Sequence, residues 1–229
     1  MSQEIEPFYD KEHTCLLCNE RHTSKKLRSR FIRVDMIDTD FHTTYKNPEY
    51  NPALYEIIVC PKCGYAFSDM FSNNFPPGAE EAIYEQVSKR WLPRDFGDIR
   101  TVDDAIETYK LGIVAGTLKK EKHIVMAGLC LRLAWLYRMK EEEKQEMRFL
   151  RLSLNYYKSA YEQSDFLGTQ MSEIKLLYLL GELSRRAGNE QEAVRYFSMV
   201  IEHKSRSFET KTVEMAREQW YVIRNKEEE

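Results

Sequence analysis

The sequence predicts an α+β protein that is mostly α-helical, with a small β region followed by an array of antiparallel helices. All seven prolines and four of the five cysteines precede residue 100, in a loop-rich stretch. After residue 100 there is no proline, and apolar residues recur at the i, i+3, i+4 spacing of helices with one buried face. We therefore expect a β domain at 1–72, a connecting segment at 73–100 and a helical domain at 101–229.

The composition is that of a soluble globular chain. It has 229 residues, of which 31% are charged and 42% hydrophobic, which is enough to bury a core as one large domain or two smaller ones. The net charge of −3 implies no general attraction to nucleic acid or anionic lipid. The polar start MSQEIEPFYDKEH does not resemble a signal peptide, and no stretch approaches the roughly 18 apolar residues of a membrane span. We expect a cytoplasmic protein with no membrane partner.

Two C-x-x-C pairs, CLLC at 15–18 and CPKCG at 60–64, contain four of the five cysteines. Structural disulfides are rare in the cytosol, so a metal site is the better explanation. Two such pairs are typical of a four-thiolate zinc site, because each tight turn points two sulfurs at one ion. The predicted ligands of a structural Zn²⁺ are Cys15, Cys18, Cys60 and Cys63. Gly64 suits the second turn, which often needs a positive φ.

Three alternatives to this zinc site stay open from the residues alone. Iron bound as in rubredoxin uses the same ligands, and either pair alone has the form of a redox dithiol. His13 and His22 flank the first pair, but four thiolates already suffice, so we expect both histidines to lie beside the ligands or to be exposed. Cys130 lies in an apolar helical segment and is predicted to be a core residue.

The residues between and after the two pairs predict the strands of a zinc ribbon over 11–72. Strand-like segments cover 27–37 and 54–60, and 65–68 has the composition of a returning strand. A zinc ribbon tolerates a long insertion because each C-x-x-C turn forms locally. We expect the segment near 38–52 to be an expanded loop.

The remaining segments predict one short helix and six longer ones. The short helix is expected at 79–90, between Pro76-Pro77-Gly78 and the break around Pro93 and Gly97. Thr101, with Asp104 three residues later, is a predicted N-cap, and Asn189 is another. The longer helices are expected within 101–120, 122–140, 141–164, 168–188, 189–205 and 207–229.

One stretch of the helical half has the spacing of a tetratricopeptide repeat. Small residues in this pattern let two helices approach, and large ones fill the groove between them. The pattern recurs more loosely upstream, which predicts a degenerate tetratricopeptide-like array covered by a C-terminal helix. An ordinary helical bundle is the alternative. The matching residues are Leu177, Leu180, Gly181, Ala193, Phe197 and Val200, while Ser184 replaces the tyrosine of the pattern.

The order of these motifs resembles a bacterial family catalogued as domain of unknown function 2225. The resemblance rests on CLLC, a Tyr/Asn/Pro-rich stretch, LYEIIVCPKCGYAFS and the proline-free helical half, with VCPKCGYA as its most specific part. It implies a cytosolic bacterial protein with a zinc-ribbon-like N-terminus. It carries over no catalytic residues.

The motifs predict a non-enzymatic interaction or scaffold protein with a protein or peptide partner. We find no nucleophile motif, phosphate loop or H-x-E pattern, and the five histidines are scattered. A helical array presents a groove to partners, lined mainly by the first helix of each repeat. The candidate partner-binding residues are Arg132, Lys175, Glu182 and Arg185, although solvated helix faces would contain the same residues.

The alternative function is nucleic-acid binding through the basic segment 21–33. Basic residues on a strand beside an aromatic side chain such as Phe31 can hold phosphates and stack a base. The acidic residues that follow, Asp35, Asp38 and Asp40, weigh against this alternative. The candidate residues are Lys25, Lys26, Arg28, Arg30 and Arg33.

Overall fold

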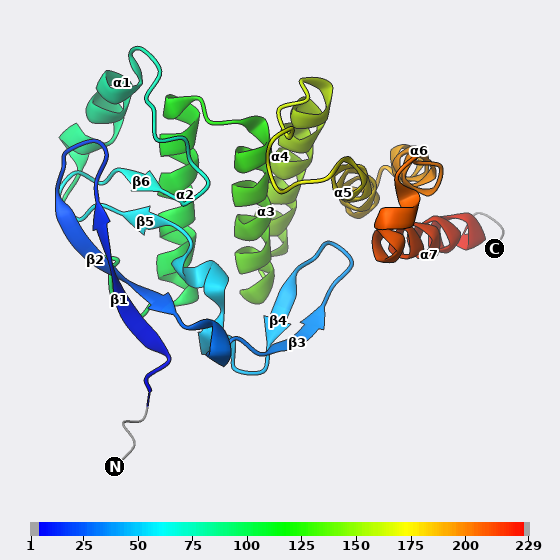
Figure 1. The fold of residues 1–229 in the computed structure, drawn as a ribbon, viewed down its shortest axis with the longest axis horizontal. Coiled ribbons are helices and arrows are strands. Elements are labelled where there is room, and N and C mark those ends of the chain that lie inside the picture. Colours follow the sequence, from blue (N-terminus) through cyan, green and yellow to red (C-terminus); the bar gives the residue numbers. More distant parts are fainter. Residues whose placement is uncertain (1–4, 227–229) are drawn as a thin grey trace. The chain divides into compact units, whose positions relative to one another are not determined.

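The computed structural model describes residues 5–226 and confirms a mostly helical α+β fold (Figure 1). Its strands pair only as two-stranded antiparallel sheets within the described residues. The expected short helix and each expected longer helix are present. The α-helices are α1 (Ala79–Gln86), α2 (Val102–Lys119), α3 (His123–Met139), α4 (Glu143–Glu162), α5 (Glu173–Arg186), α6 (Glu190–Ile201) and α7 (Thr210–Lys226).

The described chain forms two compact units. Unit 1 contains the residues up to Ile37 together with His42–Glu121 and Trp135–Glu143. Unit 2 contains Asp38–Phe41, Lys122–Ala134 and the residues from Lys144 onward. Helix α2 is therefore grouped with the strands, so these units do not follow the change in composition near residue 100. The domain boundaries expected from composition stay a prediction.

Two hairpins of unit 1 each enclose one C-x-x-C pair. Strand β1 (Phe8–Thr14) pairs with β2 (Arg21–Leu27), and the first pair lies in the turn between them. Strand β5 (Ile58–Val59) pairs with β6 (Ala66–Phe67) around the second pair. The expected returning strand at 65–68 is confirmed by β6. The first hairpin places the two cysteines of CLLC where its strands end.

The strand expected over 27–37 is wrong as a single element. Strand β2 ends at Leu27, a 3₁₀ turn follows at Ser29–Phe31, and β3 begins only at Val34. The chain turns because the amides of Phe31 and Ile32 bond back to carbonyls three residues earlier. Strand β3 (Val34–Ile37) then pairs with β4 (Thr43–Tyr45), so the expected loop near 38–52 contains a strand of its own.

The strand expected over 54–60 is shorter than predicted. A 3₁₀ turn at Pro52–Tyr55 replaces its first two residues, because the Asn51 side chain caps the Ala53 amide at 2.9 Å. Buried Arg100 then donates to the Ile57 carbonyl at 2.7 Å and to the Leu54 carbonyl at 3.1 Å. These bonds satisfy carbonyls that a longer strand would have paired.

Helices α1 and α2 pack on the region that holds the cysteines. Thr101 is the N-cap of helix α2, and its side chain and that of Asp104 form the predicted capping box. Gly112 lets α2 approach Ile57 closely, since a Cβ there would lie 3.3 Å from the Ile57 side chain. Ile83 of α1 and Ala115 of α2 join the core around the cysteines. The two helices thus cover the sulfur cluster with apolar side chains.

In unit 2, α5 and α6 form a tight helical hairpin. Asn189 caps α6 by accepting from the Glu192 amide, as predicted. A Cβ on Gly181 would lie 2.7 Å from the Phe197 ring, so the glycine allows the ring to pack against α5. Ala193 and Phe197 are fully buried. The hairpin is the one that the repeat pattern predicts, while its assignment to the tetratricopeptide repeats stays a prediction.

Within residues 5–226, none of the helices combines the length and the apolar character that a membrane crossing requires.

Candidate metal centre

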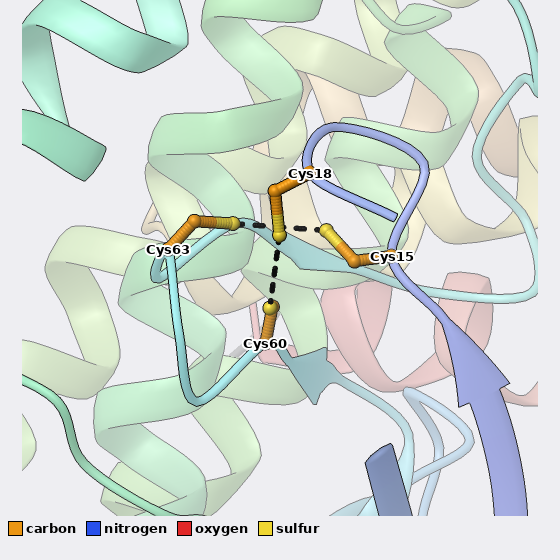
Figure 2. Close-up of side chains that lie close together, drawn as sticks. All are labelled: Cys15, Cys18, Cys60 and Cys63. Atoms are coloured by element: carbon orange, nitrogen blue, oxygen red, sulfur yellow. Dashed lines mark hydrogen bonds between the residues drawn. The ribbon is translucent and has the colours of Figure 1, made fainter. Parts of the chain in front are cut away.

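The four cysteines of the two C-x-x-C pairs meet in one cluster (Figure 2). All four Sγ atoms lie within 4.8 Å of one another. The Cys15 and Cys63 sulfurs are 3.6 Å apart, and so are those of Cys18 and Cys60. A tetrahedral zinc ion with Zn–S bonds of about 2.3 Å places its sulfurs about 3.8 Å apart. The spacing of the sulfurs therefore fits one metal ion bound by four thiolates. None of the four cysteines forms a disulfide.

Both cysteine turns have the same backbone hydrogen bonds. The Asn19 amide donates to the Cys15 carbonyl at 2.9 Å, and the Gly64 amide donates to the Cys60 carbonyl at 2.9 Å. Asn19 and Gly64 each follow the second cysteine of their pair and have positive φ, 59° and 72°. Asparagine and glycine are the residues that adopt this conformation most readily. The two turns are thus equivalent in structure, and each presents two sulfurs to the same point.

Gly64 is required for a second reason. A Cβ at this position would lie 2.5 Å from the Trp91 ring. The Trp91 indole N–H donates to the Pro61 carbonyl inside the second turn at 2.9 Å. Trp91 therefore packs on the turn and holds its backbone in place, which the sequence alone did not indicate.

The environment of the thiols favours a bound cation. Cys15 and Cys60 are fully buried, and burial raises the pKa of Cys60 to about 11. A hydrogen bond from Cys63 lowers the pKa of Cys15 to about 5, while that bond and burial raise the pKa of Cys63. The protein alone therefore stabilises one thiolate among these buried sulfurs. A divalent cation at their centre would favour the thiolate forms of Cys60 and Cys63, whose pKa values the protein alone raises.

A model of the family described as "Uncharacterized protein conserved in bacteria (DUF2225)" matches residues 8–223. The chain belongs to this family. No curated protein and no solved structure matches this chain. The family match covers both the cysteine turns and the helical hairpin of this DUF2225 chain.

The two histidines near the first cysteine pair lie outside the sulfur cluster. His13 and His22 face each other across the β1–β2 ladder, with ring centroids 5.8 Å apart. His13 Nε2 shares a hydrogen bond with Ser24 Oγ at 3.0 Å, and burial lowers the pKa of His13 to about 4. Cys130 is fully buried on α3, as predicted, and burial raises its pKa to about 12.

The predicted partner-binding residues of this DUF2225 chain have different surroundings. Lys175 is exposed on α5, whereas Arg132 and Arg185 are half-buried. Glu182 is fully buried and accepts hydrogen bonds from Arg185 at 2.7 and 2.8 Å. It therefore belongs to an internal charge network of unit 2.

The rest of that network comes from residues that sequence reasoning missed. Arg186 donates to Glu182 at 2.7 Å and lies 2.9 Å from Asp38 at the tip of the β3–β4 hairpin. Thr39 of the same tip donates to Glu182 at 2.6 Å. These partners lie far apart in the sequence, so spacing along α5 could not reveal them.

The two lysines of segment 21–33 are ion-paired within unit 1. Lys25 lies 2.9 Å from Asp10, and Lys26 lies 3.8 Å from Asp69. Strand β1, which pairs with β2, supplies Asp10, so the strand beside the basic one carries its counter-charge.

The three arginines of that segment differ from one another. The guanidinium of Arg28 lies 4.8 Å from the centre of the Tyr9 ring, and that of Arg30 lies 4.8 Å from the centre of the Phe31 ring. Arg33 is exposed. The candidate nucleic-acid residues thus do not form one uniform, unpaired basic face.

Proposed function

We propose that this DUF2225 chain is a non-enzymatic cytoplasmic protein whose fold is stabilised by a zinc ion. It binds a protein or peptide partner through its helical region. One observation carries the zinc part of the proposal: four thiols from two equivalent turns point at one centre, with sulfurs 3.6 Å apart in two cross-turn pairs. Four protein sulfurs fill a tetrahedron and leave no position for water or substrate. The ion would therefore stabilise the fold rather than activate a reactant.

The pairing of the sulfurs favours a metal over a redox dithiol. A C-x-x-C redox site forms its disulfide within one pair, but here the close contacts join Cys15 to Cys63 and Cys18 to Cys60. Iron would use the same four ligands. We propose zinc because it is the ion of structural four-cysteine sites and takes part in no redox chemistry.

The partner-binding part of the proposal is supported by the α5–α6 hairpin. Two helices packed through Gly181 and Phe197 are the unit from which helical arrays build a binding groove. Of the four predicted surface residues, Lys175 is the exposed one. The nucleic-acid alternative gains less support, because Lys25 and Lys26 already face carboxylates.

Native mass spectrometry of protein expressed with both zinc and iron in the medium tests the metal. We expect one zinc ion per chain, and replacement by Co²⁺ should give the visible absorption of a tetrahedral four-thiolate site. A chain isolated without metal, or with a disulfide within either C-x-x-C pair, would contradict the zinc part of the proposal.

Affinity capture tests the partner part. Tagged chain and its Lys175→Glu variant would be compared with and without nuclease, followed by identification of the co-purifying proteins. We expect a nuclease-resistant partner whose recovery falls in the variant. Loss of all co-purifying material on nuclease treatment would favour the nucleic-acid alternative instead.

A further inference from the structure

A cavity of about 530 Å³ lies beside the cysteine turns in unit 1. Leu17, Cys18, Lys62 and Cys63 line it from the two turns. The other lining residues come from α1 and the turn that follows it. The volume falls within the roughly 300–1,000 Å³ of ligand-binding cavities, and it is far larger than an ion needs.

The α1 side of this cavity is acidic. It contributes Glu80, Glu81 and Glu85, while Lys62 is the cavity's one lining cation among the described residues. Lys62 already lies 3.0 Å from Glu20. Neither Glu80 nor Glu81 forms an ion pair with another residue within 5–226. A divalent ion held by four thiolates would leave a net charge of −2 beside the same cavity. The electrostatics therefore favour a cationic occupant.

The cavity also offers an aromatic surface. Tyr84 lines it and is 56% exposed, so its ring face is available beside the glutamates. A ring next to carboxylates suits an alkylammonium or guanidinium group, through cation–π attraction and ion pairing together. The buried Ser88 hydroxyl, also in the lining, has no hydrogen-bond partner among the described residues.

We propose that this cavity receives the arginine or lysine side chains of a basic protein segment. Glu80 and Glu81 would pair with the cationic groups, since Glu85 already pairs with Lys89 at 2.9 Å. Leu17 and Tyr84 would contact the apolar stems that carry those groups. The cavity's size fits more than one such side chain, which is why we assign it to a peptide rather than to an inorganic cation. This site is distinct from the α5–α6 surface of the proposed function.

The test uses the full metal-loaded chain and a fluorescein-labelled peptide of alternating glycine and arginine. Its binding is measured by fluorescence anisotropy against a peptide with glutamine in place of arginine. We expect the arginine peptide to bind at least about tenfold more tightly, and Glu80→Gln with Glu81→Gln to weaken its binding about tenfold. Metal content and thermal unfolding are measured for each variant. They show whether weaker binding comes from the altered cavity or from an unfolded protein.

A matched double variant separates the cavity from general charge attraction. Glu214→Gln with Glu218→Gln removes the same charge from exposed positions of α7 and should change binding less than about twofold. Tyr84→Ala should weaken binding several-fold, and Tyr84→Phe should retain it. Equal weakening by the two double variants, or equal affinity for the arginine and glutamine peptides, would overturn the proposal. Because binding and metal content are read separately, either proposal can fail alone.

Discussion

Unit 1 and the α5–α7 part of unit 2 differ in what stabilises their folds. The cysteine-bearing hairpins of unit 1 have strands of 7 and of 2 residues, in sheets of only two strands. Isolated two-stranded hairpins are marginally stable in water at best. Helices α5 and α6, of 14 and 12 residues, bury continuous apolar faces against each other.

The difference shows what each kind of sequence requires. A segment rich in proline and short strands buries little apolar surface by itself, and the proposed metal cross-link between two distant turns would supply the missing constraint. A proline-free segment with caps and a small residue at its helix contact needs no such cross-link. The clearest experiments remove one stabilising feature from one unit and measure both.

The largest expected effect is that of Cys60→Ser. We expect the variant to lose its zinc and the hydrogen-exchange protection of β5, β6 and α2, because structural zinc contributes on the order of 10 kcal/mol to small metal-bound folds. Amides of α5 and α6 should stay protected. Metal analysis and hydrogen exchange followed by mass spectrometry read the two units separately.

Cys130→Ala is the matched control for the cysteine variant. It also removes one buried thiol, but from α3, away from the sulfur cluster. Zinc content should be unchanged, with a loss of stability of about 1 kcal/mol from the small cavity. A full complement of zinc in Cys60→Ser would contradict the site described above.

The second prediction concerns the charge network of unit 2. Arg186→Met leaves the buried carboxylates of Glu182 and Asp40 with fewer partners, and breaking a buried pair on one side costs about 3–5 kcal/mol. Arg185 still pairs with Glu182, so we expect the free energy of unfolding of Arg186→Met to fall by about 3 kcal/mol. Urea unfolding monitored at α5 measures this loss.

Lys175→Met is the control for Arg186→Met, since both side chains lie on α5 but Lys175 is exposed. Exposed substitutions usually change the free energy of unfolding by less than about 0.5 kcal/mol. Equal effects of the two variants would show that the network contributes nothing beyond an ordinary surface position.

The third prediction compares two glycines within helices of unit 2. Gly181→Ala places a methyl group against the buried Phe197 ring, and overpacking of this kind costs about 1–3 kcal/mol, partly offset by about 1 kcal/mol of helix propensity. We expect a net loss of up to about 2 kcal/mol. At Gly128 the nearest atom to a Cβ, at 2.9 Å, is Nη1 at the far end of the Arg132 side chain.

Gly128→Ala should therefore raise the free energy of unfolding, by up to about 1 kcal/mol. Thermal unfolding of both variants tests the opposite signs. If both alanines stabilise the protein, Phe197 does not pack against Gly181 as closely as described.

Features that depend on neighbouring residues were predictable from the sequence. The helices, the Thr101 and Asn189 caps and the two cysteine turns each rest on a few adjacent side chains. Pairing the two turns was also predictable, because a tetrahedral ion needs four ligands and the chain has two pairs.

Features that depend on distant residues were not predictable. The strand expected over 27–37 failed because 3₁₀ hydrogen bonds at Ser29–Phe31 outweighed its strand-like composition. Glu182 has the spacing of a groove residue, yet it is buried because Arg186 on its own helix and Thr39 in a distant hairpin surround it. Nothing in the residues beside Glu182 indicates Thr39.

The smallest expected effect tests a single charge at the α5–α6 contact. Glu192 lies 2.6 Å from Lys158 and accepts from the Ser184 hydroxyl at 3.0 Å. Partial burial acts to raise the pKa of Glu192, but the hydrogen bonds from Lys158 and Ser184 outweigh it and lower that pKa below its ordinary value. A carboxyl whose pKa is lowered in the folded state stabilises that state above its unfolded pKa, about 4.3, and loses this contribution as the pH falls through the folded value.

Glu192→Gln should therefore cost about 1 kcal/mol at pH 7, and the difference from the native chain should shrink as the pH falls below about 4. Hydrogen exchange of α5 and α6 amides measures this effect locally, so the loss in acid of any metal ion that unit 1 binds does not affect the result. Glu218→Gln, exposed on α7, should show no such pH dependence. A difference for Glu192→Gln that persists undiminished at pH 3 would mean that the glutamine disturbs packing, and that the carboxylate's charge is not what joins the helices at this contact.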